Sequence, residues 1–124
     1  MLLVTSRRTK RWIIPKGWPI KGMTPARAAA REAYEEAGVR GRIKGRAIGY
    51  YVYEKHLEDH GVSIPCEVQV FLLAVTGQSK HWPESKERTA RWFSTANAVA
   101  VVADDGLRDL ILQLEALKGT ASSR

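Results

Sequence analysis

Residues 17–39 read GWPIKGMTPARAAAREAYEEAGV, and this stretch carries the strongest structural signal in the chain. Thr24 and Pro25 predict a helix start, because a threonine hydroxyl caps a first turn and proline suits the first helical position. Gly38 is typical of a helix end. The sequence therefore predicts a helix between Thr24 and Gly38 that follows a loop, residues 15–22, with two prolines and two glycines.

The predicted helix gathers three carboxylates on one face. At about 100° per residue, Glu32, Glu35 and Glu36 fall within about 100° of one another. Like charges on one helix face repel, and a hard cation such as Mg²⁺ or Mn²⁺ would offset that repulsion with oxygen ligands. The alternative is a solvated acidic face with Arg31 as its local partner. A separate stripe, which we expect to face a sheet, contains Ala26, Ala30, Ala33 and Ala37.

Strand signals surround this helix. Strands are expected where β-branched and aromatic residues concentrate, at residues 2–5, 12–14, 43–53, 66–76 and 89–93. The second long strand is expected to bury Val68, Val70, Leu72 and Ala74. Polar connections are expected at residues 56–65 and 77–88. A capped turn at Ser94 or Thr95 and a last amphipathic helix from Asp104 or Asp105 complete the order, which favours an α/β fold with a mixed sheet.

Length and composition exclude several classes of protein. The 124 residues, 44% apolar and 27% charged, are typical of one globular domain and not of a disordered chain. No apolar run approaches the roughly 20 residues of a membrane-spanning helix, and no secretory signal opens the chain. The single Cys66 excludes an internal disulfide and a cysteine cluster for zinc. We therefore expect a cytoplasmic protein without a membrane partner.

The positive charge is concentrated near the N-terminus. Residues 1–46 hold twelve basic and three acidic residues, a net charge of +9, whereas residues 47–124 hold eight basic and ten acidic residues, a net charge of −2. Such a field favours an anionic partner, unless the residues form only a solvated basic face. Aromatic residues make up 8%, and no nucleic-acid-binding motif accompanies the charge.

Residues 17–39 resemble the signature of Nudix hydrolases: Gly, five residues, Glu, seven residues, then Arg-Glu-aliphatic-x-Glu-Glu-x-Gly-aliphatic. The 23-residue register is intact from Gly17 through Arg31 to Val39. The likeness extends over nearly all of residues 2–117. Met23 stands where the signature has its first glutamate, and its side chain cannot accept a hydrogen bond from Arg31 as that glutamate does. Ala33 replaces a larger aliphatic residue.

The resemblance implies an α/β/α sandwich with a mixed sheet, formed by a single domain at residues 1–118 and followed by a flexible tail at residues 119–124. The family normally has another strand upstream of the position of Leu2, so the resemblance leaves two alternatives: the start is mis-assigned or truncated, or this sheet lacks its first strand. An open sheet edge would then favour a homodimer.

The same resemblance implies a metal-dependent hydrolase that cleaves a phosphoanhydride bond. Within the family the chain looks most like the diphosphoinositol polyphosphate phosphohydrolases, which also accept dinucleoside polyphosphates. The implied metal ligands for Mg²⁺, with Mn²⁺ as an alternative, are Glu32, Glu35, Glu36 and Gly17, with Glu36 the least replaceable. Arg31 is expected to orient these carboxylates. The expected substrate-binding residues are Arg7, Arg8, Lys10, Lys16 and Arg88, with Ser6 and Lys21 contributing to the same cluster.

Other interpretations remain open at this level. The chain is alternatively a non-catalytic Nudix module that binds a phosphorylated ligand, an RNA 5′-end pyrophosphohydrolase or a nucleic-acid-binding protein, although nucleic acid is not expected except as an RNA 5′ end. Glu84 and Glu87 are candidates for an additional carboxylate that activates water. Trp18 and Trp82 fit equally well as packing residues, and Trp82 also as a residue that stacks a base.

Overall fold

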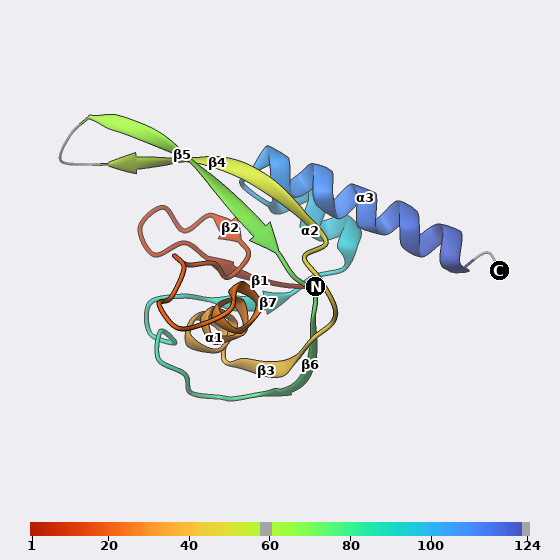
Figure 1. Ribbon diagram of the computed structural model, residues 1–124, viewed down its shortest axis with the longest axis horizontal. Helices are drawn as coiled ribbons and strands as arrows, with labels where there is room; N and C mark the ends of the chain where they lie inside the picture. The colour runs from red at the N-terminus through yellow and green to blue at the C-terminus, as the bar shows by residue number, and fades with distance from the viewer. Residues whose placement is uncertain (58–60, 123–124) are drawn as a thin grey trace.

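The computed structural model describes residues 1–57 and 61–122, with the side chains up to residue 116. Its elements are, in chain order, β1 (Leu2–Thr5), β2 (Trp12–Ile13), α1 (Pro25–Ala37), β3 (Val39–Ile43), β4 (Gly49–Leu57), β5 (Val62–Val70), β6 (Leu73–Gln78), β7 (Ala90–Trp92), α2 (Thr95–Val101) and α3 (Asp105–Ser122) (Figure 1). The α/β class expected from the sequence is confirmed.

Strand β1 lies between two layers of helices. Its residues alternate in direction: Leu3 packs in a cluster with residues of α2 and α3, whereas Val4 packs in a second cluster with Ala33 and Ala37 of α1. Both leucine and valine are fully buried. This alternation places α1 on one side of the strand and α2 and α3 on the other, which is the predicted α/β/α layering (Figure 1).

Helix α1 begins and ends as the sequence predicts. The Thr24 side chain accepts a hydrogen bond from the backbone N–H of Arg27, and Pro25 occupies the first turn. Gly38 ends the helix with φ of 72°, a left-handed conformation that favours glycine. The predicted alanine stripe is only partly buried, because Ala33 and Ala37 face the core while Ala28 is buried in place of Ala26 and Ala30.

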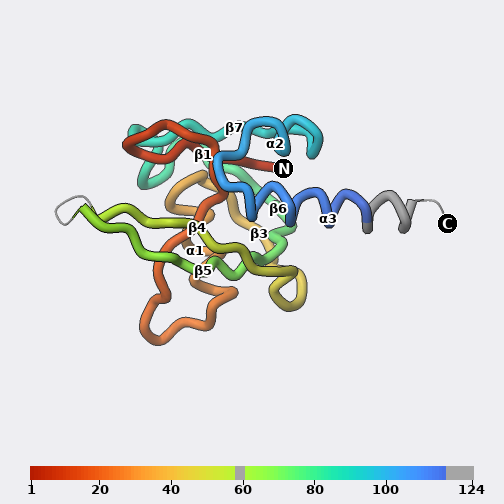
Figure 2. Tube along the Cα trace, turned by 90° about the horizontal axis from the view of Figure 1, so that it is seen from above, coloured from red at the N-terminus to blue at the C-terminus, as the bar shows by residue number. Residues whose placement is uncertain are grey.

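The strands form three small antiparallel sheets in the described part of the chain. Their orders are β2-β1-β7, β3-β6 and β4-β5, and an isolated parallel bridge joins Trp12 to Val102. Strand β1 is central in its sheet, so both of its edges are paired. The β4–β5 hairpin and α3 extend from the body in opposite directions (Figure 2).

Several strand boundaries differ from the prediction. The expected strand at residues 43–53 is divided into the end of β3 and the start of β4, and the expected strand at residues 66–76 is divided between β5 and β6. The polar connection predicted at residues 56–65 is wrong at both ends, because β4 continues to Leu57 and β5 begins at Val62. Residues 58–60 lie outside the described part. Leu72, expected to be buried, is 43% exposed because it lies between the two strands.

The last helix packs as its spacing predicts. Leu107, Leu110 and Ile111 are buried against the hairpin and α2, and Gly49 of β4 lies so close to Leu110 that a Cβ atom would meet it at 2.6 Å. The backbone of α3 continues to Ser122, beyond the start of the predicted tail. None of the described helices is long and apolar enough to cross a membrane.

Candidate active site

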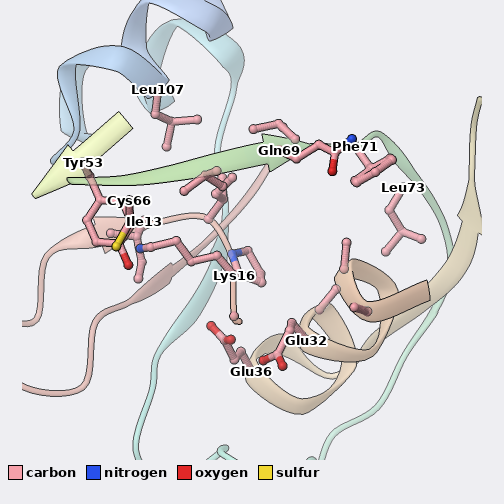
Figure 3. Close-up of a pocket in the computed structure, with 18 of the residues that line it drawn as sticks. Ile13, Lys16, Glu32, Glu36, Tyr53, Cys66, Gln69, Phe71, Leu73 and Leu107 are labelled. Atoms are coloured by element: carbon pink, nitrogen blue, oxygen red, sulfur yellow. The ribbon is translucent and has the colours of Figure 1, made fainter. Parts of the chain in front are cut away.

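A cavity of about 1440 Å³ opens where the loop before α1, the face of α1 and the β4–β5 hairpin meet. Glu32 and Glu36 of α1 project into it, and Lys16 of the loop lies opposite them (Figure 3). The two glutamates are four residues apart, so consecutive turns of α1 place them side by side. This part of the cavity therefore brings the carboxylates of Glu32 and Glu36 together with the ammonium group of Lys16.

The loop backbone lies directly against Glu32. A Cβ atom added to Gly17 would meet the Glu32 Cδ at 2.5 Å and its Oε1 at 2.6 Å. A residue with a side chain would therefore displace this carboxylate. The sequence assigned Gly17 to the site by resemblance, and the structure places it in contact range of the Glu32 carboxyl group.

Glu36 is nearly removed from water, with only 2% of the residue exposed. Burial raises the pKa of the Glu36 carboxyl to about 8, with a hydrogen bond that protonated Glu36 donates to Glu32 acting in the same direction and Arg88 opposing it. The acid pair thus retains a proton near neutral pH when nothing else neutralises it.

Arg88 connects the acid pair to a third carboxylate. Its Nε donates to Glu84 Oε1 at 2.7 Å, its Nη1 donates to the carbonyl of Thr5 at 3.1 Å, and its Nη2 lies 3.7 Å from Glu36 Oε1. The guanidinium is only 10% exposed. The sequence proposed Arg88 for substrate phosphates, but the structure directs each of its nitrogens toward a protein oxygen.

The connection after β6 is anchored on the C-terminal end of α1. Ser79 N–H donates to the carbonyl of Gly38, Trp82 Nε1 to that of Glu36 and Glu84 N–H to that of Glu35. These bonds satisfy carbonyls that a helix end leaves without intrahelical partners. They also place Glu84, one of the expected additional carboxylates, beside Glu36, whereas Trp82 packs against Gly38.

Glu35 is directed differently from the other two glutamates. Its Oε1 accepts a hydrogen bond from Arg31 Nε at 3.1 Å, and it does not line the cavity. The described side chains include no group of three His, Cys, Asp or Glu residues arranged to hold a metal ion. The structure therefore brings together Glu32 and Glu36 with Gly17 and pairs Glu35 with Arg31.

Lys16 is held above the acid pair by the hairpin. Its Nζ lies 4.6 Å from the centroid of the Tyr53 ring, and its side chain is directed toward Tyr53 and Cys66 (Figure 3). Burial lowers the pKa of the Lys16 ammonium, while Asp104 and Glu36 act against that shift. This environment makes Lys16 a partly desolvated cation under the influence of the Asp104 and Glu36 carboxylates.

The turn between β1 and β2 carries most of the other predicted phosphate-binding residues, and Lys21 lies in the loop before α1. Arg7 Nη1 is 3.4 Å from Glu87 Oε2, and Lys10 Nζ donates to the Glu87 carbonyl at 3.1 Å. Glu87, the other expected additional carboxylate, thus engages these cations at the surface. Arg7 and Arg8 line the cavity, whereas Lys10 does not.

Some cavity residues were not identified from the sequence. Tyr53 and Lys55 come from the hairpin, whose pairing places Tyr53 opposite Cys66 and Lys55 opposite Ile64. Asp104, just before α3, does not line the cavity but acts on the charge of Lys16. Only the alternation of Tyr51, Tyr53 and Lys55 along one strand face offered a local signal, and it did not indicate which face meets the loop.

Replacing Gly17 with alanine is expected to reduce the activity proposed below by about 100-fold. The new Cβ would push the Glu32 carboxylate out of place, and a misplacement of about 1 Å at a reacting site can cost a factor of that size. Stability should change little, since the flexible end of Glu32 can move. Gly22→Ala in the same loop is the matched control. Its new Cβ would meet no atom within 4 Å, but the residue has a φ of 82°, which strains a residue with a side chain. That variant should lose about 1 kcal/mol of stability and keep its activity. Equal activities of the two variants would contradict the assignment of Gly17.

Comparisons with known proteins found relatives of this chain. The chain is 35% identical over 104 residues to diphosphoinositol polyphosphate phosphohydrolase 2 of Rattus norvegicus. The aligned region covers 82% of this chain and 53% of that protein. The chain is 33% identical over 102 residues to the mitochondrial Nudix hydrolase 12 of Arabidopsis thaliana, covering 80% of this chain and 50% of that protein. The chain thus spans about half the length of the curated relatives it matches.

The fold also matches a solved structure. The crystal structure of the C. elegans Ap4A hydrolase has a TM-score of 0.57 and 17% identity, covering 94% of this chain and 83% of that chain. The family model of the NUDIX domain matches residues 1–114, a range that includes the loop, the acidic helix and the Arg88 connection. A match of that extent, together with the glutamates set against Gly17, shows that the chain belongs to the NUDIX domain family.

Proposed function

We propose that this protein is a divalent-cation-dependent hydrolase that cleaves a phosphoanhydride bond in a highly phosphorylated small molecule. The observation that carries the proposal is the meeting of Glu32 and Glu36 in one cavity, against Gly17 and opposite Lys16. Carboxylates on one side and a cation on the other suit a substrate made of a metal-bound diphosphate. The name of the rat relative, a diphosphoinositol polyphosphate phosphohydrolase, and that of the fold neighbour, an Ap4A hydrolase, support a polyphosphate substrate.

The donor set fits Mg²⁺ or Mn²⁺. Glu36 is buried and only partly neutralised by Arg88 at 3.7 Å, and repulsion from Glu32 acts on the same carboxyl group. A hard cation prefers such oxygen ligands and would replace the shared proton. We propose that Glu32 and Glu36 hold the cation beside Gly17, with Glu35 as the further carboxylate of the same helix. Such a cation, when bound, would neutralise the charge of the diphosphate.

The chain's own residues then orient the reaction. A water oxygen forms a bond to phosphorus as the bridging P–O bond breaks, and the leaving phosphate departs with the bonding electrons. The proton of that water passes to a carboxylate. Glu84 is suited to accept it, because its side chain is 22% exposed and lies beside Glu36. Arg88 holds Glu84 and Glu36 in place, and Lys16 binds a substrate phosphate across the cavity.

The proposal is tested by product analysis on a panel of substrates with Mg²⁺, with Mn²⁺ and with EDTA. The panel comprises a diphosphoinositol polyphosphate, diadenosine polyphosphates, ADP-ribose, nucleoside triphosphates and RNA with a 5′-triphosphate. Metal-dependent release of a phosphorylated product from one class is the expected result. Absence of turnover together with metal-independent binding of these compounds would overturn it in favour of a non-catalytic module.

A further inference from the structure

Trp18 is an exposed aromatic residue beside the acid pair. It lines the cavity, yet 58% of the residue is exposed. It directly follows Gly17, whose backbone lies against the Glu32 carboxylate. Pro19 comes next and restricts the backbone of Trp18 to extended conformations. The indole is therefore carried on a stiff loop, one residue away from the proposed metal site.

The other tryptophans are engaged in the fold. Trp12 meets Phe93 edge-on with 5.0 Å between ring centroids, Trp82 packs on Gly38 and donates to the Glu36 carbonyl, and Trp92 donates to Gln78 Oε1 at 3.0 Å. Trp18 differs, because its indole N–H has no hydrogen-bond partner among the described residues and its ring contacts the Nζ of Lys55 at 5.1 Å from the centroid. One face of the indole is thus covered by a cation, and more than half of the residue remains open to solvent.

The charged groups form an ordered series from the acid pair to this indole. Lys16 Nζ lies over the ring of Tyr53, and Lys55 is two residues further along the same face of β4. Lys55 in turn lies over Trp18. The series runs from carboxylates to two ammonium groups and then to an aromatic face. A nucleotide presents its groups in the matching order, with metal-bound phosphates at one end and an aromatic base at the other.

We propose that Trp18 is a specificity-determining residue whose indole stacks on an aromatic base of the substrate. The inference rests on the proposed function and narrows it: a phosphoanhydride attached to a nucleoside should bind better than one attached to an aliphatic ring such as inositol. A base has a π-face for the indole, and an aliphatic ring has none. This preference differs from the inositol substrate in the names of the curated relatives.

The loop lowers the cost of such stacking. Met23 N–H donates to the carbonyl of Ile20 at 3.0 Å and closes a turn, while Lys55 fixes the orientation of the indole by its contact with one face. A ring already held in place loses little conformational freedom when a ligand binds. Stacking on one aromatic side chain is expected to contribute about tenfold in affinity.

The test compares two probes that differ by a nucleoside. In the presence of Mg²⁺, titration calorimetry measures the affinity of α,β-methylene-ADP and of methylenediphosphonate for the wild type, Trp18→Leu and Trp18→Phe. Trp92→Leu is the matched control, since it removes a tryptophan of similar exposure, 51%, from another part of the cavity wall. Quenching of indole fluorescence by the nucleotide provides a second readout that does not depend on turnover.

The expected result is that Trp18→Leu weakens the nucleotide about tenfold, leaves methylenediphosphonate unchanged and removes the quenching, while Trp18→Phe retains most of the affinity. Equal affinity of the wild type for both probes, or an equal loss for both in Trp18→Leu, would overturn the role of Trp18 and leave the proposed function standing. Failure of the wild type to bind either probe with Mg²⁺ would overturn the proposed function and the inference with it.

Discussion

Replacing Glu36 with glutamine is expected to lower kcat/KM for phosphoanhydride hydrolysis by about 1,000-fold, because a metal-binding carboxylate supplies several kcal/mol of transition-state stabilisation and about 1.4 kcal/mol corresponds to a factor of ten. Glu36 is the most buried acidic residue described, at 2% exposure, and it lies between Glu32 and Arg88. An amide has nearly the same shape but carries no charge to hold the cation.

The fold of this variant should survive. Trp82 donates to the main-chain carbonyl of residue 36, a contact that the substitution leaves in place. The change also removes a carboxyl group that burial and Glu32 both disfavour in its ionised form. Thermal unfolding in EDTA should therefore show a melting temperature equal to or above that of the wild type, whereas addition of Mg²⁺ should stabilise only the wild type.

Two further glutamate-to-glutamine substitutions provide the controls. Glu35→Gln should reduce activity less than Glu36→Gln, because Glu35 pairs with Arg31 and does not line the cavity. Glu87→Gln, which removes an exposed carboxylate paired with Arg7, should leave activity unchanged. An effect at Glu35 as large as that at Glu36 would show that Arg31 releases Glu35 during turnover. Wild-type activity in Glu36→Gln would refute the metal-site assignment.

The part of the fold that could be predicted is the part fixed by local interactions. Helix α1 has its cap at Thr24, its first-turn proline and its terminal Gly38 where the sequence indicates them. The distal part of the hairpin was missed because residues 62–65 are exposed, so no core contact accompanies the short apolar-polar alternation of Val62, Ser63 and Ile64. Its strands are paired by the ladder from Gly49–Val70 to Leu57–Val62, which is a contact between segments and not a local preference.

The same distinction applies to the site. Helical spacing was sufficient to place Glu32 and Glu36 together, and the family signature added Gly17. Helical spacing also placed Glu35 on that face, but the structure gives it to Arg31, since residues four apart on a helix are neighbours. The positions of Lys55 over Trp18 and of Arg88 between Glu36 and Glu84 depend on tertiary contacts that no local pattern specifies.

Replacing Arg88 with methionine is expected to destabilise the protein by about 3–5 kcal/mol, the usual cost of removing one partner from a buried ion pair. The side chain is 10% exposed, and its loss leaves Glu36 and Glu84 without their cation and the Thr5 carbonyl without its donor. Arg31→Met is the matched control, because its pair with Glu35 is exposed, at 53% and 32%, and should contribute about 0.5 kcal/mol or less. Urea unfolding of both variants in EDTA measures the difference.

The loss at Arg88 should also depend on pH in a defined direction. The pKa of Glu36 is raised to about 8 in the folded protein from an ordinary value of 4.5, so the carboxyl is mostly neutral below pH 8 and ionised above it. Because Arg88 stabilises only the ionised form, its removal raises this pKa further, and the destabilisation should grow as the pH rises through 8. The loss at pH 6 should therefore be smaller than that at pH 9, and the remainder at pH 6 reflects Glu84 and Thr5. A pH-independent loss would mean that Arg88 stabilises the fold through its hydrogen bonds alone and does not counter the charge of the acid pair.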